Sequence, residues 1–489
     1  MKFTKRTPLI LPLIVIPLIL SVAILIWGRL MTPKPTCDKC NVVLISIDTL
    51  SALHLPCYGY DRNTAPNLCK FADENINFLN SYSQSPYTIS SHFSIFTSLY
   101  PHTHKMTNTI GDILNENYLT LAQLYRMNGY KTLYYGPPAD PHLPLNRGIE
   151  RGFDFFDKNY NISFGKNWNS VYQKLIENTN QGKSSFFFLH TYAVHDPYLT
   201  KHQVKHRFTN LPEYPNIALT REEYNTLSPE LLSSCANQQV DYKSIINEHM
   251  SKIVESNKQN LEKLAKVKNL QEGTSLFNTL DATVRRFCIG SWNQSKVDTN
   301  DPNQVAYMRA LYDEQIYNMD QNLGKFLKLM ADPKLAKNTI IIITADHGEE
   351  FMEHGRLYHG SNIFRTSTQV PLIMHIPGIK PKKISELVQG IDIYPTVVSL
   401  TNMVPKSLIE GINLTGLIKG DKNAPTNNYI KSELNNTVAT QHNNLRYYYN
   451  SVDNIPFGLY NLTADPQEQD NLIDSGQKMI NQFKKMLKQ

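Results

Sequence analysis

Four short runs of β-branched and aromatic residues lack the alternation that a half-exposed strand would show. These runs are residues 41–47, 184–192, 338–345 and 369–376. Continuous apolar runs of this length are typical of strands that are buried on both faces of a parallel sheet. Segments with helical periodicity lie between them, notably residues 119–130 and 305–330. Because strands that alternate with helices indicate βαβ units, we expect an α/β fold with a doubly wound, mostly parallel sheet.

The pattern changes in two other parts of the chain. Residues 200–305 are polar and carry no recognisable motif, which indicates an insertion that covers one side of the main domain. From residue 425 onward, short strand patterns precede a last amphipathic helix. We therefore expect an N-terminal segment and linker at 1–40, a main α/β domain at 41–424 that contains the insertion, and a small antiparallel α+β subdomain at 425–489.

Residues 8–27 form an uncharged apolar run that is long enough to cross a bilayer once. Lys2, Lys5 and Arg6 precede this run and favour a cytoplasmic N-terminus with the main domain on the other side of the membrane. A cleaved signal peptide is the alternative, but the run is long for one and no clear cleavage site follows it. The sequence thus predicts a transmembrane helix that anchors an extracytoplasmic domain, periplasmic or extracellular, which would be secreted if the segment were removed.

The six cysteines suit an oxidising compartment. Bridges between neighbours are the simplest of the possible pairings, and they would join Cys37 to Cys40, Cys57 to Cys69, and Cys235 to Cys288. The spacing of the first pair also occurs in zinc and redox motifs, but no second such pair or nearby histidine completes a zinc site. We therefore expect structural disulfides.

The charge of the chain argues against a nucleic-acid partner. The formal net charge at pH 7 is +6 for 489 residues, which is a weak bias. The sequence contains no long run of Lys or Arg and no nucleic-acid-binding motif.

Acidic residues directly follow two of the predicted strands. Asp48 comes after the strand at 41–47, and Asp346 with His347 comes after the strand at 338–345. Ligands of open α/β sheets gather at the carboxyl ends of strands, and a carboxylate there is costly unless it is paired or binds a metal. If Asp48 were the only acidic residue at a strand end, a role as a helix N-cap would explain it equally well. Because a second strand end carries both an aspartate and a histidine, the pattern favours a metal site.

Residues 41–104 resemble the opening of the sulfatase family, within the alkaline phosphatase superfamily. The resemblance continues, in the same order, through residues 186–198, 310–324, 344–378, 391–400 and 458–472. It thus covers most of residues 41–475 apart from the insertion. It implies an alkaline-phosphatase-like fold and a metal-dependent hydrolase of sulfate esters. The implied substrate is an anionic ester on a glycan, a lipid headgroup or a small molecule.

The resemblance also implies that Asp48, Asp346 and His347 bind one divalent metal ion together with the side chain at position 88. Sulfatases have a cysteine or serine there that is oxidised to formylglycine, whereas this chain has Thr88. The Asp, Thr, Asp and His set is similar to the single-metal sites of lipid phosphoethanolamine transferases and lipoteichoic acid synthases. Mixed carboxylate and imidazole ligation favours Zn²⁺ or Mn²⁺ over Ca²⁺. We expect Thr88 to be the nucleophile and to carry a covalent intermediate.

Three further histidines are implied to act on the anionic group. His195 and His359 match family positions that bind this group or protonate the leaving oxygen, and an imidazole can do either near neutral pH. His92 stands where sulfatases have an arginine and is expected to contact the same anion. The alternative for each is a histidine that serves only the structure.

Three functions stay open on the sequence. The family resemblance favours sulfuric ester hydrolysis, whereas Thr88 and His347 favour phosphodiester hydrolysis or transfer of a phosphoryl group on a lipid headgroup or glycan. The third is a non-catalytic binding protein with the same fold, because Ser51 replaces an arginine of relatives and removes a bidentate donor to an anion. Ser90 likewise replaces the proline of the nucleophile motif. The joint presence of all four ligands and both flanking histidines favours an enzyme.

Overall fold

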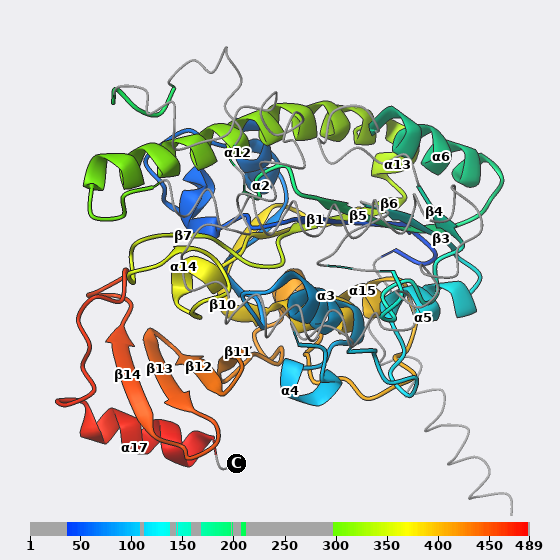
Figure 1. Cartoon of the computed structure of the whole chain (residues 1–489). Coiled ribbons are helices and arrows are strands. Elements are labelled where there is room, and N and C mark those ends of the chain that lie inside the picture. The colour runs from blue at the N-terminus through cyan, green and yellow to red at the C-terminus, as the bar shows by residue number, and fades with distance from the viewer. Residues whose placement is uncertain are drawn as a thin grey trace, which may run out of the picture.

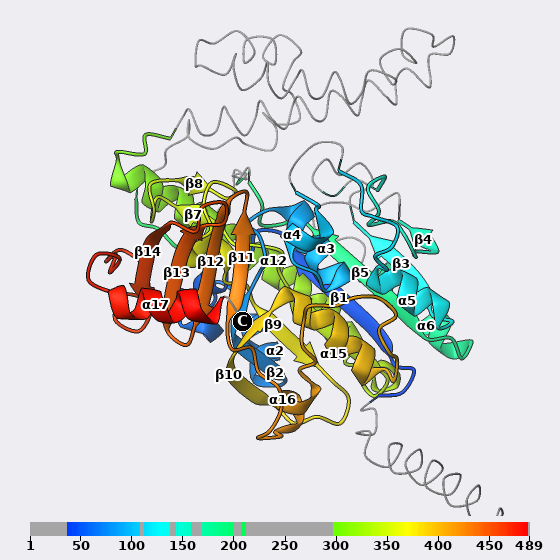
Figure 2. The ribbon, with the colours of Figure 1, turned by 90° about the horizontal axis from the view of Figure 1, so that it is seen from below.

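The computed structural model describes residues 37–107, 112–136, 143, 145–157, 168–196, 198, 207–211 and 297–487. Within these residues, eight strands form one sheet that carries helices on both faces (Figures 1 and 2). The strand order across the sheet is β10-β2-β9-β6-β1-β5-β3-β4. The bounds are β1 (Asn41–Ile47), β2 (Ile76–Tyr82), β3 (Lys131–Tyr135), β4 (Phe155–Phe156), β5 (Ser185–Thr191), β6 (Thr339–Thr344), β9 (Leu372–His375) and β10 (Lys382–Gln389).

Strand β1 lies at the centre of the sheet and pairs in parallel with β5 on one side and β6 on the other. Every residue of these three strands is buried, which explains why their sequences do not alternate. Strand β9 is antiparallel to both of its neighbours, β6 and β2. The prediction of an α/β fold with a mostly parallel sheet is confirmed, and the sheet is mixed because of this strand.

Alternate side chains of β1 enter two separate cores. Val43 and Ile45 pack into the core on one face, and Val42 and Leu44 pack into the core on the other. The first core lies under α2 (Pro66–Asp73), α6 (Trp168–Asn180), α12 (Pro302–Met330) and α13 (Pro333–Ala336). The second lies under α3 (Thr88–Thr97), α4 (Pro101–His104), α5 (Leu121–Met127), α15 (Ile393–Leu400) and α16 (Thr415–Lys419).

Short elements connect the strands near the edge where the predicted site residues lie. They are η1 (Ala52–His54), η2 (Pro56–Tyr58), β7 (Glu350–Phe351), β8 (Leu357–Tyr358), α14 (Arg365–Thr368) and η3 (Gly390–Asp392). Strands β7 and β8 pair with each other as a small antiparallel hairpin.

The C-terminal part forms a separate antiparallel sheet, coloured orange to red in Figure 1. It contains β11 (Ile430–Leu434), β12 (Thr437–His442), β13 (Leu445–Asn450) and β14 (Pro456–Asn461), and α17 (Gln477–Met486) packs on it. Arg446 joins this sheet to the main domain, since its guanidinium donates to the carbonyl of Ile363 (2.9 Å) and to the hydroxyl of Thr368 (2.7 Å). This arrangement agrees with the expected antiparallel α+β subdomain, whereas its boundary at residue 425 stays a prediction.

Two of the three expected disulfides are present, Cys37–Cys40 and Cys57–Cys69. The third expected pair, Cys235 and Cys288, lies outside the described residues, as do residues 8–27 and most of the insertion at 200–305. Among the described helices, none combines the length and the apolar character that a bilayer-spanning segment requires. The membrane anchor therefore stays a prediction.

Candidate active site

Two parallel neighbouring strands, β1 and β6, bring the predicted acidic residues together at their carboxyl ends. The backbone N–H groups of Thr49 and His347 both donate to Oδ1 of Asp346, at 3.2 and 2.9 Å. Thr49 has a φ of 58°, so the chain turns sharply just after Asp48. This left-handed conformation is uncommon for a β-branched residue and is found where the surrounding structure holds a functional site in place. Asp48 and Asp346 are both fully buried at this edge.

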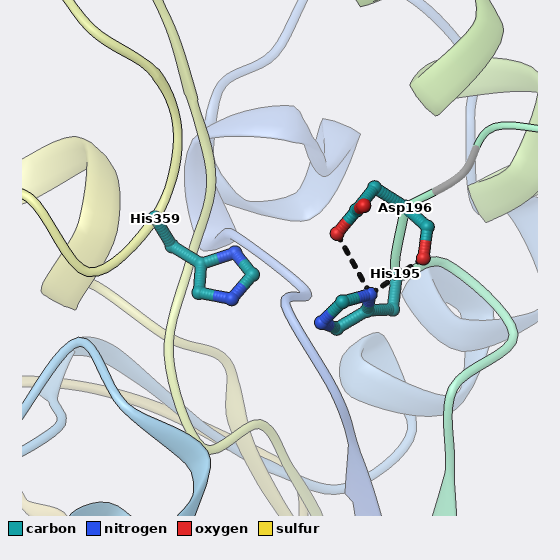
Figure 3. A group of neighbouring side chains, drawn as sticks. All are labelled: His195, Asp196 and His359. Carbon is teal, nitrogen blue, oxygen red and sulfur yellow. Dashed lines mark hydrogen bonds and ion pairs between the residues drawn. The ribbon is translucent and has the colours of Figure 1, made fainter. Parts of the chain in front are cut away.

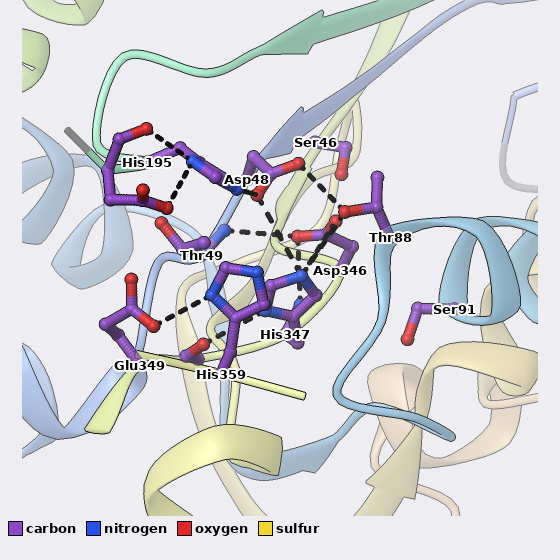
Figure 4. A network of polar contacts seen from close by, with 12 residues as sticks. Ser46, Asp48, Thr49, Thr88, Ser91, His195, Asp346, His347, Glu349 and His359 are labelled. Carbon is purple, nitrogen blue, oxygen red and sulfur yellow. Dashed lines mark hydrogen bonds and ion pairs between the residues drawn. The ribbon is translucent and has the colours of Figure 1, made fainter. Parts of the chain in front are cut away.

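Thr88, the first residue of α3, lies against both strand ends (Figure 4). Its hydroxyl donates to Oδ2 of Asp48 at 3.3 Å and lies 3.4 Å from Nε2 of His347. Nδ1 of His347 lies 3.0 Å from the carbonyl oxygen of Gly348, which can only accept a hydrogen bond. The proton of this imidazole is therefore on Nδ1, and Nε2 presents a lone pair to the centre of the site.

The four predicted metal ligands thus converge. One ligand atom each of Asp48, Asp346 and His347 lies within 4.8 Å of the other two. Oδ2 of Asp346 is buried and accepts no hydrogen bond from any described residue, although it lies 3.6 Å from Nε2 of His347. A bound cation would compensate this buried carboxylate oxygen. The donor set of two carboxylates, an imidazole and a hydroxyl fits a divalent metal ion, whose identity as Zn²⁺ or Mn²⁺ stays a prediction.

The charges of these groups also suit metal binding. Burial lowers the pKa of His347 to about 4, against the opposing effect of Asp346, so the imidazole is neutral. Burial alone would raise the pKa of Asp346, but the nearby His347 and His92 outweigh it and hold this pKa below its usual range. The site therefore presents an ionised carboxylate and a neutral imidazole, the forms that bind a cation.

His92 lies one turn along α3 from Thr88 and is fully buried. Its Nδ1 donates to the carbonyl of Thr88 (2.8 Å), and its Nε2 accepts from the hydroxyl of Ser46 (2.9 Å). Burial and the neighbouring His190 lower the pKa of His92 to about 3, which keeps the ring neutral. Because both ring nitrogens contact protein atoms, this arrangement favours support of the Thr88 backbone over the predicted contact with an anion.

His195 lies on the opposite side of the Asp48 carboxylate from Thr88, and the ring of His359 lies beside that of His347 (Figure 4). Nε2 of His195 is 3.9 Å from Oδ1 of Asp48, and Nε2 of His347 lies at the same distance of 3.9 Å from that oxygen. The rings of His195 and His359 are 5.0 Å apart between centroids (Figure 3), and those of His347 and His359 are 4.3 Å apart. The structure therefore brings both predicted histidines close to the predicted metal ligands.

Three residues outside the predicted catalytic and metal-ligand sets complete the site, namely His190, Glu349 and Tyr198. His190, in β5, has its Nε2 3.4 Å from Oδ2 of Asp48. Glu349 contacts Nδ1 of His359 with Oε1 (2.9 Å), and its Oε2 accepts from the hydroxyl of Tyr198 (2.6 Å). Burial, together with the charge of Asp196, raises the pKa of Glu349 to about 8. His190 lies inside the predicted strand at 184–192, and its place beside Asp48 follows only from the pairing of β5 with β1.

Ser51, at the position where relatives have an arginine, has a structural role. Its hydroxyl donates to the carbonyl of Thr366 (3.2 Å) and accepts from the N–H of Leu53 (3.3 Å), which caps η1. Ser51 and Glu349 line a cavity of about 500 Å³ together with Arg62 and others. Arg62 pairs with the buried Asp313 at 2.8 Å, so its guanidinium is already engaged within the protein.

Comparisons with known proteins agree with this architecture. The family model described as Sulfatase matches residues 40–403, and the model described as N-sulphoglucosamine sulphohydrolase, C-terminal, matches residues 352–489. The chain is 22% identical over 500 residues to N-acetylglucosamine-6-O-sulfatase of Bacteroides thetaiotaomicron, and this match covers 93% of this chain and 87% of that protein. It is 23% identical over 455 residues to choline-sulfatase of Rhizobium meliloti, with coverages of 91% and 85%. A match of 29% identity to arylsulfatase K of Gallus gallus covers 38% of this chain and 37% of that protein.

Solved structures share the fold at low sequence identity. Phosphonate monoester hydrolase of Agrobacterium radiobacter superposes with a TM-score of 0.64 at 17% identity, over 92% of this chain and 95% of that one. A protein solved in complex with its substrate D-glucosamine-2-N,6-O-disulfate also superposes with a TM-score of 0.64 at 17% identity, over 92% of this chain and 97% of that one. At such identities the likeness establishes the common fold.

Proposed function

Because the chain belongs to the sulfatase family of sulfuric ester hydrolases, we propose that it hydrolyses an anionic sulfate ester through a covalent intermediate on Thr88. The observation that supports this proposal is the contact of the Thr88 hydroxyl with Oδ2 of Asp48 (3.3 Å) and Nε2 of His347 (3.4 Å). We further propose that residues 8–27 hold the catalytic domain at the extracytoplasmic face of a membrane.

The proposed reaction uses the two sides of the Asp48 carboxylate. A divalent cation held by Asp48, Thr88, Asp346 and His347 would lower the pKa of the Thr88 hydroxyl and polarise the ester. The Thr88 oxygen forms a bond to sulfur while the bond from sulfur to the leaving oxygen breaks, and Asp48 is the nearest acceptor for the hydroxyl proton. The leaving oxygen departs toward His195 and His359, and the protonated ring of one of them donates the proton that the leaving oxygen takes. Water then attacks the sulfur and gives its proton to that histidine, while Asp48 returns its proton to the Thr88 oxygen as the bond from that oxygen to sulfur breaks and sulfate is released.

Phosphoester chemistry is the second candidate, and Thr88 itself favours it. A threonine lacks the second hydroxyl of a hydrated aldehyde, so its ester can be released only by attack on the sulfur or phosphorus atom. At phosphorus, an acceptor alcohol can make that attack in place of water. The protein would then be a phosphoryl-group transferase that acts on a lipid headgroup or glycan.

Paired substrates separate these functions. The full chain, purified in detergent, is assayed with an aryl sulfate and with a bis-aryl phosphate, beside the Thr88→Ala variant. The proposal expects hydrolysis of the sulfate ester that depends on Thr88. Hydrolysis of the phosphate diester alone would instead support the second candidate. No turnover of either ester, with no stoichiometric metal in the protein, would identify a binding protein.

A further inference from the structure

The amino ends of the central parallel strands form the edge of the sheet that is opposite the candidate active site. Strands β6, β1, β5 and β3 are successive neighbours in the sheet and run in the same direction (Figure 1). The carboxyl ends of β1 and β6 lead to Asp48 and Asp346, and β1, with seven residues, is about 20 Å long. The length of these strands therefore separates the amino edge from the candidate active site.

An exposed lysine stands at or just before the start of each of these four strands. Lys39, Lys183 and Lys337 lie two residues before the first residues of β1, β5 and β6, and Lys131 is the first residue of β3. These four residues are called the lysine row. Adjacent strands are about 4.8 Å apart, so the four positive charges follow one another along the edge, and the exposed Asp38 offsets one of them. Like charges at neighbouring positions repel each other, and an anionic partner would relieve this repulsion.

Exposed apolar side chains flank the lysine row. The N–H of Cys37 donates to the carbonyl of Leu400 at 3.2 Å, so the segment that follows α15 begins at the same edge. Val404 and Leu408 in that segment are 75% and 61% exposed, and Met127, which precedes β3, is 57% exposed. Apolar side chains beside lysines suit the surface of a bilayer, where apolar groups enter the interface and cations contact anionic headgroups.

The length of the N-terminal linker places a membrane next to this edge. Cys37 is the first described residue, and residues 28–36 separate it from the predicted membrane-spanning segment at 8–27. An extended chain spans at most about 3.6 Å per residue, so this linker reaches about 35 Å at most. The amino edge is therefore the part of the domain that the anchor would hold closest to the bilayer.

We propose that the amino edge of the central sheet docks on the anionic lipid headgroups of the membrane that the N-terminal segment enters. The lysine row contacts the lipid phosphates, and Val404 and Leu408 enter the interface. The candidate active site then faces away from this bilayer, so its substrate is a glycan or small ester that arrives from solution and not a lipid headgroup of the same membrane. The inference rests on the proposed function only in the membrane anchor and does not depend on the chemistry at Thr88.

Lysine acylation, read by mass spectrometry, tests this inference. The full chain is reconstituted in nanodiscs of phosphatidylcholine and phosphatidylglycerol in equal amounts, in nanodiscs of phosphatidylcholine alone, and in detergent, and each sample is treated briefly with an amine-acylating reagent. We expect the anionic nanodiscs to slow acylation of the lysine row at least about fivefold relative to detergent, the factor that one lysine gains near an anionic bilayer surface. Neutral nanodiscs or high salt should remove most of this protection. Lys478, an exposed lysine of α17, is the internal control and should react equally in all samples.

A triple variant separates the lysine row from the anchor. Lys131→Gln/Lys183→Gln/Lys337→Gln should abolish the protection of Lys39 in anionic nanodiscs and leave the hydrolysis of a soluble aryl sulfate unchanged. The matched variant Lys478→Gln/Lys484→Gln/Lys485→Gln removes three exposed lysines of α17 and should keep Lys39 protected.

The possible failures are distinguishable. Equal acylation of the lysine row in detergent and in anionic nanodiscs that contain the chain would overturn the docking and leave the anchor and the proposed chemistry intact. Protection that is as strong in detergent or in neutral nanodiscs would identify a contact with a second copy of the chain, which also overturns the inference. A chain that does not enter nanodiscs would overturn the anchor together with the inference, whereas hydrolysis that depends on Thr88 would still support the proposed reaction.

Discussion

Oε1 of Glu349 lies 2.9 Å from Nδ1 of His359, so a buried carboxyl group orients an imidazole at the edge of the predicted metal ligands. The hydroxyl of Tyr198 contacts the other carboxylate oxygen at 2.6 Å and restrains its rotation. The ring of His359 is thereby held 4.3 Å from the ring of His347, between centroids.

Glu349 is therefore expected to position His359. We predict that Glu349→Ala lowers kcat by about 10- to 100-fold, because His359 loses the partner that orients its ring, and a well-positioned proton donor contributes about 100- to 10,000-fold. Glu349→Gln keeps an oxygen that can accept from Nδ1 and should retain most of the activity. Measurement of kcat and KM for both variants checks this prediction. Equal losses in the two variants would argue against a positioning role.

The hydroxyl of Thr88 is predicted to be essential for activity. Thr88→Ala should lower kcat by at least about 1000-fold, because removal of a nucleophile removes the covalent route. Thr88→Ser retains the hydroxyl and should keep measurable activity. Thr97→Ala, in the same helix, removes a hydroxyl that donates to the carbonyl of Phe93 and should affect stability more than turnover. Steady-state kinetics of the three variants test this prediction, and full activity in Thr88→Ala would contradict the mechanism.

Removal of the metal should abolish activity reversibly. Dialysis against a chelator should eliminate turnover, and Zn²⁺ or Mn²⁺ should restore it better than Ca²⁺, because an imidazole and a hydroxyl complete the ligand set. Asp346→Asn should prevent this restoration. Recovery with Ca²⁺ alone would show that the metal preference inferred from the donor set is wrong.

Asp320 offers a matched control for the loss of a buried carboxylate. Its oxygens accept from the N–H groups of Asn67 and Leu68, at 3.0 and 2.7 Å, and it therefore links α12 to the start of α2. Asp320→Ala should lower the free energy of unfolding by about 1–3 kcal/mol, the cost of leaving buried donors without an acceptor. Metal content, measured in parallel, should not change; a parallel loss of metal would show that the two regions are coupled.

Acid should destabilise the protein partly through His104. Its Nδ1 accepts from the N–H of Met106 (2.9 Å), its Nε2 lies 3.0 Å from the hydroxyl of Ser94, and burial lowers its pKa to about 3. The folded protein thus binds a proton at His104 less readily than the unfolded chain. This contribution to stability is fully present above about pH 6.5 and is lost as the pH falls from there toward about 3.

The measurement for His104 is the free energy of unfolding in urea between pH 7.5 and about 5. Below about pH 6.5, the wild type should lose up to about 1.4 kcal/mol per pH unit more than His104→Gln does. Parallel pH profiles for the two proteins would show that His104 does not contribute.

The central strands could be predicted from the sequence because burial on both faces leaves an uninterrupted apolar run, as in β1 and β6. The antiparallel direction of β9 could not be predicted, since a buried strand has the same pattern in either direction. Strand β10 was not identified because it lies at the edge of the sheet and four of its eight residues are exposed. Its polar residues therefore mask the strand pattern.

The site was predictable only in part from local pattern. Asp48 and Asp346 follow apolar strands directly, so their position at a sheet edge can be read from the chain. Thr88 gives no such signal, because a threonine at a helix start is common and only the family resemblance identified it. His190 required knowledge that β5 lies beside β1, and strand order is a tertiary property.

The most direct test of the central claim is peptide mass spectrometry of the full chain after brief exposure to the ester that it turns over. The account predicts that the added mass of a sulfo or phospho group appears on the peptide that contains Thr88, with isotope-labelled substrate distinguishing the two, and is absent in Thr88→Ala. Turnover at the wild-type rate with that peptide unmodified under rapid quenching, or an adduct on another residue, would contradict it.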